Sequence, residues 1–254
     1  MLLRLGEIML PVYRQDFIVD DLSVDCFGRL KPSMLLYYVQ EAAGSHFSAL
    51  EDRSDPIAKK NLFWAVTRHR VQVTRLPKLG ETVTVETWPM PTTRVAYPRA
   101  FAMYDSEGNL LAQAISLWVL MDMNTRAMVL PGKSGVVVNG TLRGCELDVP
   151  KSILPKDLPE SQYRTVTYSL LDINGHMNNT RYLDWLDDLL SAEYHASHTL
   201  QEFTICYLSE AREGQNICLH HSLSENILQV DARRERTDVD GKVDRVFSAQ
   251  VQFS

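Results

Sequence analysis

Hydrophobic and polar residues alternate along the last part of the chain. Phe247, Ala249, Val251 and Phe253 are separated by Ser248, Gln250 and Gln252. Because successive side chains of a strand point to opposite faces, this pattern predicts a strand with one buried and one solvated face. The run 115–120 is more continuously apolar, which indicates a more deeply buried strand.

Two other segments follow a helical period. Apolar residues stand at spacings i, i+3, i+4, i+7 and i+8 in both, a pattern that predicts two amphipathic helices with matching buried faces. The first set is Leu35, Tyr38, Val39, Ala42 and Ala43, and the second is Tyr182, Trp185, Leu186, Leu189 and Leu190.

These helices belong to a weak internal repeat. Residues 25–28 (Asp-Cys-Phe-Gly) align with 172–175 (Asp-Ile-Asn-Gly), and both precede a helical segment. Further along, 80–83 aligns with 214–217, and the Asp-x-x-Gly turn at 105–108 aligns with 238–241. The Asp-x-x-Gly segments predict hairpin turns, each leading into the closing strand of its half.

The repeat divides the chain into two halves. Residues 131–160 contain four prolines and four glycines, which is typical of a linker. We therefore expect an N-terminal half at 1–130, a linker at 131–160 and a C-terminal half at 161–254. Each half is predicted to contain a long helix packed on an antiparallel sheet, an α+β architecture.

Composition excludes several protein classes. The chain has 254 residues, 45% of them hydrophobic, which is enough for a substantial core without staples. Its net charge of −6 argues against nucleic-acid binding. The longest apolar stretches fall far short of the roughly 20 residues that span a bilayer. The four cysteines show no CxxC spacing, and with no signal peptide evident we expect a cytoplasmic protein.

Candidate chemistry lies in the second half, because its polar residues have no counterpart in the first. Asn174 and His176 correspond to Phe27 and Arg29, and Glu210 corresponds approximately to Leu76. A fold that both halves share cannot by itself require these polar residues.

Simpler interpretations of the same residues stay open at this point. Asp172 and Asn174 are also common turn formers, and His176 on its own could be structural. Asn178 or Asn179 could be the N-cap of the following helix, whose free N–H groups would suit an oxyanion. Spacing alone therefore leaves the reaction undefined.

The segment 172–179 (Asp-Ile-Asn-Gly-His-Met-Asn-Asn), followed by Tyr182 and Trp185, resembles the most recognisable motif of the fatty acyl-ACP (acyl carrier protein) thioesterases of plants and bacteria. The resemblance extends over most of the chain, because further motifs follow in the family's order: 60–67, 80–83, 86–88 and 116–122.

The resemblance implies a tandem (double) hot-dog fold and hydrolysis of fatty acyl-ACP, with release of free fatty acid at the end of fatty acid synthesis. It places the catalytic residues at Asp172, Asn174, His176 and Glu210, the last in a matching Tyr-x-x-Glu context at 207–210. Many members have a cysteine after this glutamate, whereas this chain has Ala211, which favours activated water over a cysteine nucleophile.

The roles within this site have alternatives. Glu210 is the preferred base, with Asn174 and helix amides on the carbonyl oxygen, His176 on the water or thiolate, and Asp172 holding Asn174 and His176. Glu210 and His176 could exchange roles, and a carboxylate could attack directly to form an anhydride. No cofactor is expected, and no metal, because zinc-type ligand spacing is absent.

The same residues also admit rival functions. These are an acyl-CoA thioesterase, a hot-dog hydratase and a non-catalytic acyl-binding module. The family's partner is acidic acyl carrier protein, so basic residues are candidate docking positions: Lys59, Lys60, Arg68, Arg70, Arg233, Arg234 and Arg236. The first half is expected to form much of the acyl tunnel. Its candidate lining is the helical stripe at 35–43 together with Phe63, Val71, Val83 and Val85. The chain could be a monomer or a homodimer.

Overall fold

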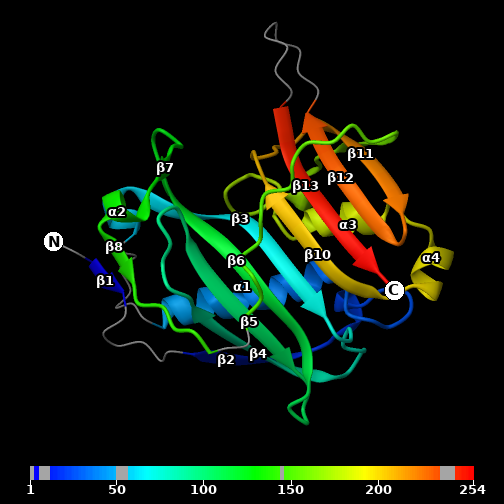
Figure 1. Ribbon diagram of the computed structural model, residues 1–254, viewed down its shortest axis with the longest axis horizontal. Coiled ribbons are helices and arrows are strands. Elements are labelled where there is room, and N and C mark those ends of the chain that lie inside the picture. The colour runs from blue at the N-terminus through cyan, green and yellow to red at the C-terminus, as the bar shows by residue number, and fades with distance from the viewer. Residues whose placement is uncertain (1–2, 6–11, 50–56, 144–145, 235–243) are drawn as a thin grey trace, which may run out of the picture. The chain divides into compact units, whose positions relative to one another are not determined.

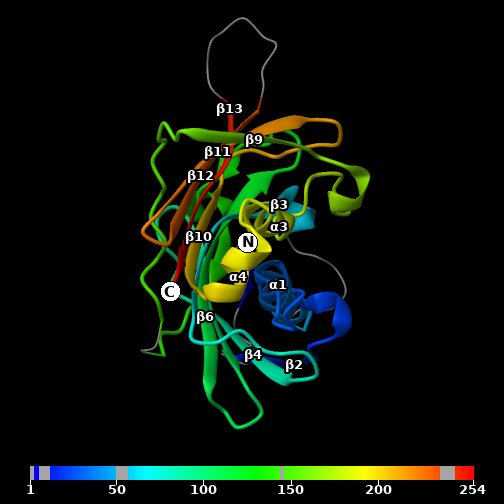
Figure 2. The ribbon, with the colours of Figure 1, turned by 90° about the vertical axis from the view of Figure 1, so that its right-hand side faces the viewer.

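The computed structural model describes residues 3–5, 12–49, 57–143, 146–234 and 244–254. It divides into two compact units, the first comprising Met1–Lys31 and Leu35–Pro150, and the second Pro32–Met34 and Lys151–Ser254. The ribbon is shown in two views in Figures 1 and 2.

The first unit contains a five-stranded antiparallel path with the order β2-β4-β5-β6-β3. These strands are β2 (Tyr13–Ile18), β3 (Leu62–Val73), β4 (Thr82–Pro89), β5 (Tyr97–Tyr104) and β6 (Leu110–Asp122). The short β7 (Met128–Val129) pairs with β6, and β1 (Leu3–Leu5) pairs in parallel with β8 (Val136–Val138). Its helices are α1 (Pro32–Ser48), of which it contains all but the first three residues, and α2 (Pro131–Ser134), with 3-10 turns at Asp21–Ser23 and Ala58–Lys60.

Helix α1 lies against one face of the first unit's strands (Figure 2). Pro32 at its first position suits helix initiation, since the missing N–H would have no partner there. All five residues of the predicted apolar stripe are buried, as their spacing predicted: Leu35, Tyr38, Val39, Ala42 and Ala43.

The opposite face of these strands is also covered. Trp88, Ala100 and Ile115 form a buried cluster on which Leu147 packs. Gly140 lies close to the end of β4, where a Cβ would overlap the backbone of Met90. Two-sided burial explains why the run within β6 is apolar almost throughout.

The second unit repeats the same strand order, β9-β11-β12-β13-β10. Its strands are β9 (Glu160–Thr165), β10 (Leu200–Tyr207), β11 (Asn216–Ser224), β12 (Ile227–Arg234) and β13 (Asp244–Phe253), with a 3-10 turn at Tyr168–Leu170. The equivalence of the two paths confirms the repeat inferred from the sequence. Its third anchor, 238–241, lies outside the described residues.

The helical part of the second unit differs from the prediction of a single long helix. It consists of α3 (Arg181–Asp187) and α4 (Ala192–Ser197), both on one face of the strands (Figure 2). Leu189 and Leu190 fall between them, because the chain tightens into i→i+3 hydrogen bonds after α3. Ser191 then caps α4 by accepting a hydrogen bond from the Tyr194 N–H.

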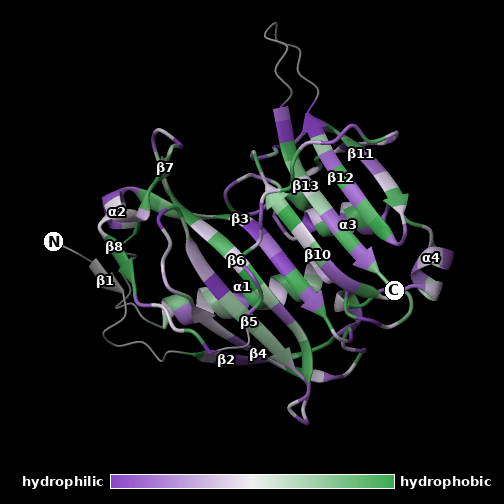
Figure 3. Ribbon diagram, viewed as in Figure 1, coloured by the Kyte–Doolittle hydropathy of each residue, from purple (hydrophilic) through white to green (hydrophobic). Residues whose placement is uncertain are grey.

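Strand β13 departs from a simple alternation of buried and exposed residues, because a further segment covers one of its faces. Figure 3 shows the mixture of hydrophilic and hydrophobic residues along β12 and β13. Gln250 and Gln252 are exposed as predicted, but Ser248 is fully buried. Beside it, Asp231 is buried between Arg233 and Arg245, whose guanidinium groups bond the carbonyl oxygens of residues 156 and 153. Part of the predicted linker therefore packs on this face.

Candidate active site

The turn at 172–176 has a well-defined backbone geometry. One carboxylate oxygen of Asp172 accepts hydrogen bonds from the Asn174 N–H at 2.8 Å and the His176 N–H at 3.2 Å. The Asp172 N–H in turn donates to the carbonyl oxygen of His176 at 2.8 Å. Gly175 has φ +73°, a left-handed conformation that glycine adopts without steric cost.

The first unit contains the same turn at 25–29. One carboxylate oxygen of Asp25 accepts from the Phe27 and Arg29 N–H groups, both at 2.9 Å. The Asp25 N–H donates to the Arg29 carbonyl oxygen, and Gly28 has φ +72°. The aspartate and the glycine thus build the turn in both units, and the two turns differ in the side chains that they present.

Glu210 lies beyond the end of β10, directly after a bulge. The N–H groups of Leu208 and Ser209 both donate to the carbonyl oxygen of Val246, so two residues face one. In the first unit, Thr74 and Arg75 do the same with Leu111. The bulge is therefore a feature of the repeated fold, whereas the acid that follows it occurs in one unit.

Backbone hydrogen bonds identify which residue of the first unit is equivalent to Glu210. The Met177 N–H donates to the Ala211 carbonyl oxygen at 2.8 Å, just as Leu30 donates to Pro77 at 2.8 Å. The residue before Ala211 is thus equivalent to the residue before Pro77, which is Leu76, as the sequence suggested. Ala211 is fully buried.

The structure brings His176 and Glu210 into direct contact. The Nε2 atom of His176 lies 3.0 Å from a carboxylate oxygen of Glu210, and Arg212 lies 3.9 Å from the same oxygen. The His176 side chain is 15% exposed and that of Glu210 42% exposed, so the pair is accessible from one side. In the first unit, Arg29 pairs instead with Asp25 of its own turn.

Asn174 is exposed and belongs to the same turn as His176, two residues before it. Its amide nitrogen lies 3.5 Å from the second carboxylate oxygen of Asp172, a long hydrogen bond. The amide can therefore turn toward a ligand at little cost. Three of the residues predicted for the site lie in this turn, and Glu210 directly follows the bulge. The Asp172 carboxylate is engaged with backbone N–H groups.

Helix α3 begins at Arg181, so the turn at 172–176 is not its first turn. The side chain of Asn178 accepts hydrogen bonds from the N–H and the hydroxyl of Thr180, both at 2.9 Å. Asn178 rather than Asn179 thus provides the side-chain acceptor near the helix start, while Thr180 holds the capping position. The expected helix amides lie farther along the chain than the turn that carries Asn174.

Sequence reasoning did not foresee two residues that border the site. Arg234, considered as a carrier-docking residue, instead donates to the Glu210 carbonyl oxygen and pairs with Asp244 at 2.7 Å. Burial raises the pKa of Tyr182, an effect that Arg234 opposes and that the charges of Asp172 and Glu210 reinforce, so its phenol stays protonated. The proximity of Arg234 to Glu210 depends on the pairing of strands, which the linear sequence does not show.

Other basic candidates are engaged within their own units. Lys60 donates to the Ser134 carbonyl oxygen, Arg68 to that of Pro150, and Arg233 pairs with Asp231. Lys59 and Arg70 also have interactions. Arg236 lies outside the described residues.

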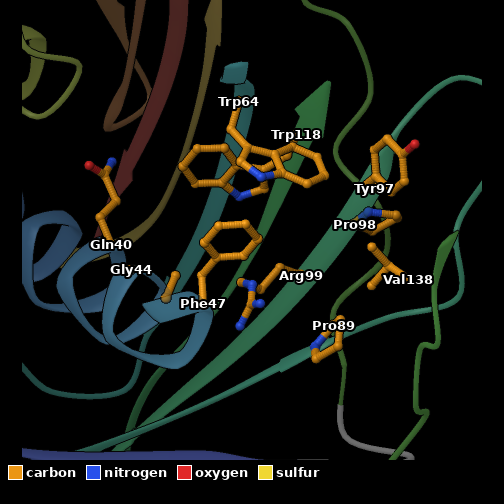
Figure 4. Close-up of a pocket in the computed structure, with 11 residues that line it drawn as sticks. Gln40, Gly44, Phe47, Trp64, Pro89, Tyr97, Pro98, Arg99, Trp118 and Val138 are labelled. Carbon is orange, nitrogen blue, oxygen red and sulfur yellow. The ribbon is translucent and has the colours of Figure 1, made fainter. Parts of the chain in front are cut away.

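The first unit contains a partly open pocket of about 200 Å³ (Figure 4). None of the four site residues lines it, and neither do the predicted lining residues Phe63, Val71, Val83 and Val85; of the helical stripe, only Ala43 contributes. The lining residues are Gln40, Ala43, Gly44, Phe47, Trp64, Pro89, Tyr97, Pro98, Arg99, Trp118 and Val138.

Two further properties bear on the kind of site. Across the described ranges, no cluster of three or more His, Cys, Asp or Glu side chains is arranged to hold a metal ion. Within the same part of the chain, no helix has the length and apolar character needed to cross a bilayer.

Comparison with known proteins identifies the family of the chain. The profile of the acyl-ACP thioesterase N-terminal domain matches residues 11–130, and that of the C-terminal domain matches residues 155–252. A palmitoyl-acyl carrier protein thioesterase from Cuphea hookeriana is 26% identical over 87% of this chain and 55% of its own length. The chain spans about half the length of the curated relatives first matched.

Solved structures confirm the double hot-dog fold. An acyl-ACP thioesterase from Bacteroides thetaiotaomicron superposes with a TM-score of 0.81 at 27% identity, covering 96% of this chain and 98% of that one. The 12:0-ACP thioesterase from Umbellularia californica gives 0.78 at 23% identity, covering 96% and 97%. The two matching domain profiles, in order and over most of the chain, show that this protein belongs to the acyl-ACP thioesterase family.

Proposed function

We propose that this protein hydrolyses the thioester of fatty acyl-ACP, releasing a free fatty acid and holo-ACP and so ending fatty acid synthesis. The contact of 3.0 Å between His176 and Glu210 is the observation that carries the proposal. It joins an imidazole and a carboxylate at positions where the equivalent unit has Arg29 and Leu76. The names of the relatives, which are acyl-ACP hydrolases, agree with this reaction.

The chemistry needs a positioned water, a base and donors for an oxyanion. Glu210 takes a proton from the water as its oxygen attacks the thioester carbon, and His176 orients Glu210 and that water. The Asn174 amide donates to the oxygen that becomes negative. The tetrahedral intermediate then expels the thiolate, which needs little acid assistance because a free thiol has a pKa of roughly 8.5.

Asp172 is a positioning residue in this scheme. Its carboxylate accepts hydrogen bonds from the backbone N–H groups of Asn174 and His176, and so fixes the backbone positions from which both side chains extend. Two alternative mechanisms give the same overall reaction. His176 could be the base in place of Glu210, or the carboxylate of Glu210 could attack the thioester directly.

The remaining assignments are proposals of the same kind. The catalytic half is residues 161–254, preceded by an N-terminal half at 1–130 and a linker at 131–160. The carrier is acyl carrier protein, the chain acts in the cytoplasm as a monomer or homodimer, and neither cofactor nor metal takes part.

The test measures free-thiol release from acyl-ACPs of medium and long chain length, with matched acyl-CoAs alongside. Glu210→Gln keeps the size of the side chain and removes the base, so we expect kcat to fall at least about 100-fold. Glu213→Gln makes the same charge change at an exposed position of the same loop and serves as the matched control.

Each result has a clear meaning. Turnover of acyl-ACP that Glu210→Gln loses and Glu213→Gln keeps supports both the reaction and the site. A full rate in Glu210→Gln contradicts the assigned base. Stoichiometric binding of acyl-ACP without thiol release by the folded wild type identifies a binding module, and a preference for acyl-CoA identifies a different carrier.

A further inference from the structure

A single arginine ties the loop that carries Glu210 to the sheet of the second unit. Arg234 is the last residue of β12, and its Nη2 atom donates to the backbone carbonyl oxygen of Glu210. Its Nη1 atom lies 2.7 Å from a carboxylate oxygen of Asp244, the first residue of β13 and the cross-strand partner of Arg234. The guanidinium therefore joins the ends of two paired strands (Figure 1) to the backbone of the candidate base.

The arginine and its acid are largely shielded from water. The side chain of Arg234 is 19% exposed and that of Asp244 is 16% exposed. The other carboxylate oxygen of Asp244 accepts a long hydrogen bond of 3.4 Å from the Ser209 hydroxyl. Salt screens a shielded pair less than a surface pair, and a planar guanidinium is well suited to holding two acceptors at once. The anchor of the Glu210 carbonyl oxygen is therefore a fixed group.

The third nitrogen of the guanidinium has no such role. The Nε–H group of Arg234 is buried and has no hydrogen-bond partner among the described residues. An unpaired buried donor destabilises the folded state, and a native structure that keeps one calls for an explanation. Proteins break such rules mainly at functional sites. The two bonds made by Nη1 and Nη2 are therefore the reason to ask what Arg234 does for Glu210.

The first unit has a different side chain at the position of Arg234. Bulges between 232 and 233 and between 103 and 104 align the β12–β13 pairing with that of β5–β6, which places Asp105 at this position. The Asp105 carboxylate acts within its own hairpin turn, where it accepts from the N–H groups of Glu107 and Asn109. The shared fold therefore does not require an arginine here, and the sign of the charge is reversed between the units.

The carbonyl oxygen of Leu76 corresponds to that of Glu210, and its donor is different. It accepts a long hydrogen bond of 3.4 Å from Arg75, the residue just before it. Arg75 engages mainly Glu81, at 2.8 and 3.0 Å. The unit without a candidate base thus holds this carbonyl weakly from a neighbouring residue, whereas the unit with the base holds it from the sheet.

We propose that Arg234 is a positioning residue of the candidate active site, which fixes the backbone of Glu210 and so keeps its carboxylate at His176. The inference rests on the proposed hydrolysis, in which Glu210 is the base. The Glu210 side chain is 42% exposed, so packing alone does not hold its carboxylate 3.0 Å from the imidazole. A displacement of about 1 Å can lower a catalysed rate by about 100-fold, so an anchor on the backbone matters.

The kinetic test compares Arg234→Ala with Arg75→Ala, the matched control that removes the arginine from the equivalent carbonyl of the first unit. Free-thiol release from acyl-ACP is measured for both variants, together with Tm. We expect Arg234→Ala to lower kcat at least about tenfold and to keep KM within about threefold, because the base moves while the substrate-binding surface stays. Arg75→Ala should also lose stability but keep kcat, since no base follows its bulge.

A rescue experiment separates positioning from general stability. Guanidinium ion at a sub-denaturing concentration can occupy the space that the side chain leaves in Arg234→Ala. It should raise kcat of this variant at least about threefold over a matched sodium chloride control, and leave Glu210→Gln unchanged. If Arg234→Ala does not fold, Arg234→Lys keeps the charge without the planar fork, and its kcat should be less than about half that of the wild type.

Hydrogen exchange tests the anchor without reference to activity. Mass spectrometry of the segment 206–215 should show faster exchange in either Arg234 variant than in the wild type, and no change in Arg75→Ala. Unchanged exchange, or a wild-type kcat in the folded Arg234 variant, overturns the inference while wild-type turnover leaves the proposed function standing. Absence of thiol release by the wild type overturns the proposed function, and the positioning of a base with it.

Discussion

Replacing Asp172 separates a structural role from a chemical one, because Asp25 builds the same turn in a unit without the candidate catalytic residues. Asp172→Ala removes the acceptor of two backbone hydrogen bonds, at 2.8 and 3.2 Å. Bonds to a charged group contribute about 1.5–3 kcal/mol each, and partial exposure reduces this to about 1 kcal/mol each. The expected loss of unfolding free energy is therefore about 2 kcal/mol.

For a chain of this size, that loss lowers Tm by about 4–8 °C, measured by circular dichroism. Asp25→Ala should lose at least as much, because Asp25 also pairs with the Arg29 guanidinium. The two variants should differ in activity. We expect kcat for thiol release to fall at least tenfold in Asp172→Ala, since Asn174 and His176 lose their anchor, and to stay unchanged in Asp25→Ala.

Asp172→Asn decides whether the charge matters. An asparagine oxygen can accept the same two N–H groups and is equally suited to this turn. If Asp172 acts only by position, Asp172→Asn keeps kcat within about threefold of the wild type. A loss as large as that of Asp172→Ala would refute the positional role and assign the negative charge itself to the reaction.

Two further variants test how buried charge affects stability. Burial holds the pKa of His69 at about 3, below the unfolded value of 6.5, so between these pH values the unfolded chain binds a proton that the folded chain does not. The free energy of unfolding should therefore fall by about 1 kcal/mol per pH unit as the pH drops below 6.5. The difference in urea midpoint between the wild type and His69→Gln should be smaller at pH 5 than at pH 7, and an equal difference at both pH values would contradict this. Asp231→Ala leaves Arg233 and Arg245 without their buried partner and should cost about 3–5 kcal/mol in urea unfolding, whereas a loss below 1 kcal/mol would show that water replaces the carboxylate.

Local patterns predicted the elements of both units well. The helical stripe at 35–43 is buried, and the turns at 25–28 and 172–175 share one geometry. These features follow from short-range rules, since periodicity selects the buried face and an Asx residue followed by glycine selects the turn. The correspondence of Glu210 with Leu76 was also readable, because the two strands before them are equivalent.

The two wrong predictions have different physical causes. Ser248 was predicted to be solvated, yet a segment from the predicted linker covers its face. The helix after 181 is interrupted, because Ser191 caps a second helix within the apolar stripe. Predictions of burial from alternation assume one covering layer, and the sequence does not state which distant segment supplies another.

By itself the sequence determined the duplicated architecture, the turn and the identity of the polar residues that only the second half carries, because these depend on neighbours in the chain and on comparison of the halves. Tertiary structure alone decided which atoms meet. The bulge after β10 sets Glu210 at 3.0 Å from His176. Contacts between residues distant in the chain arise from strand register and packing, which no local pattern encodes.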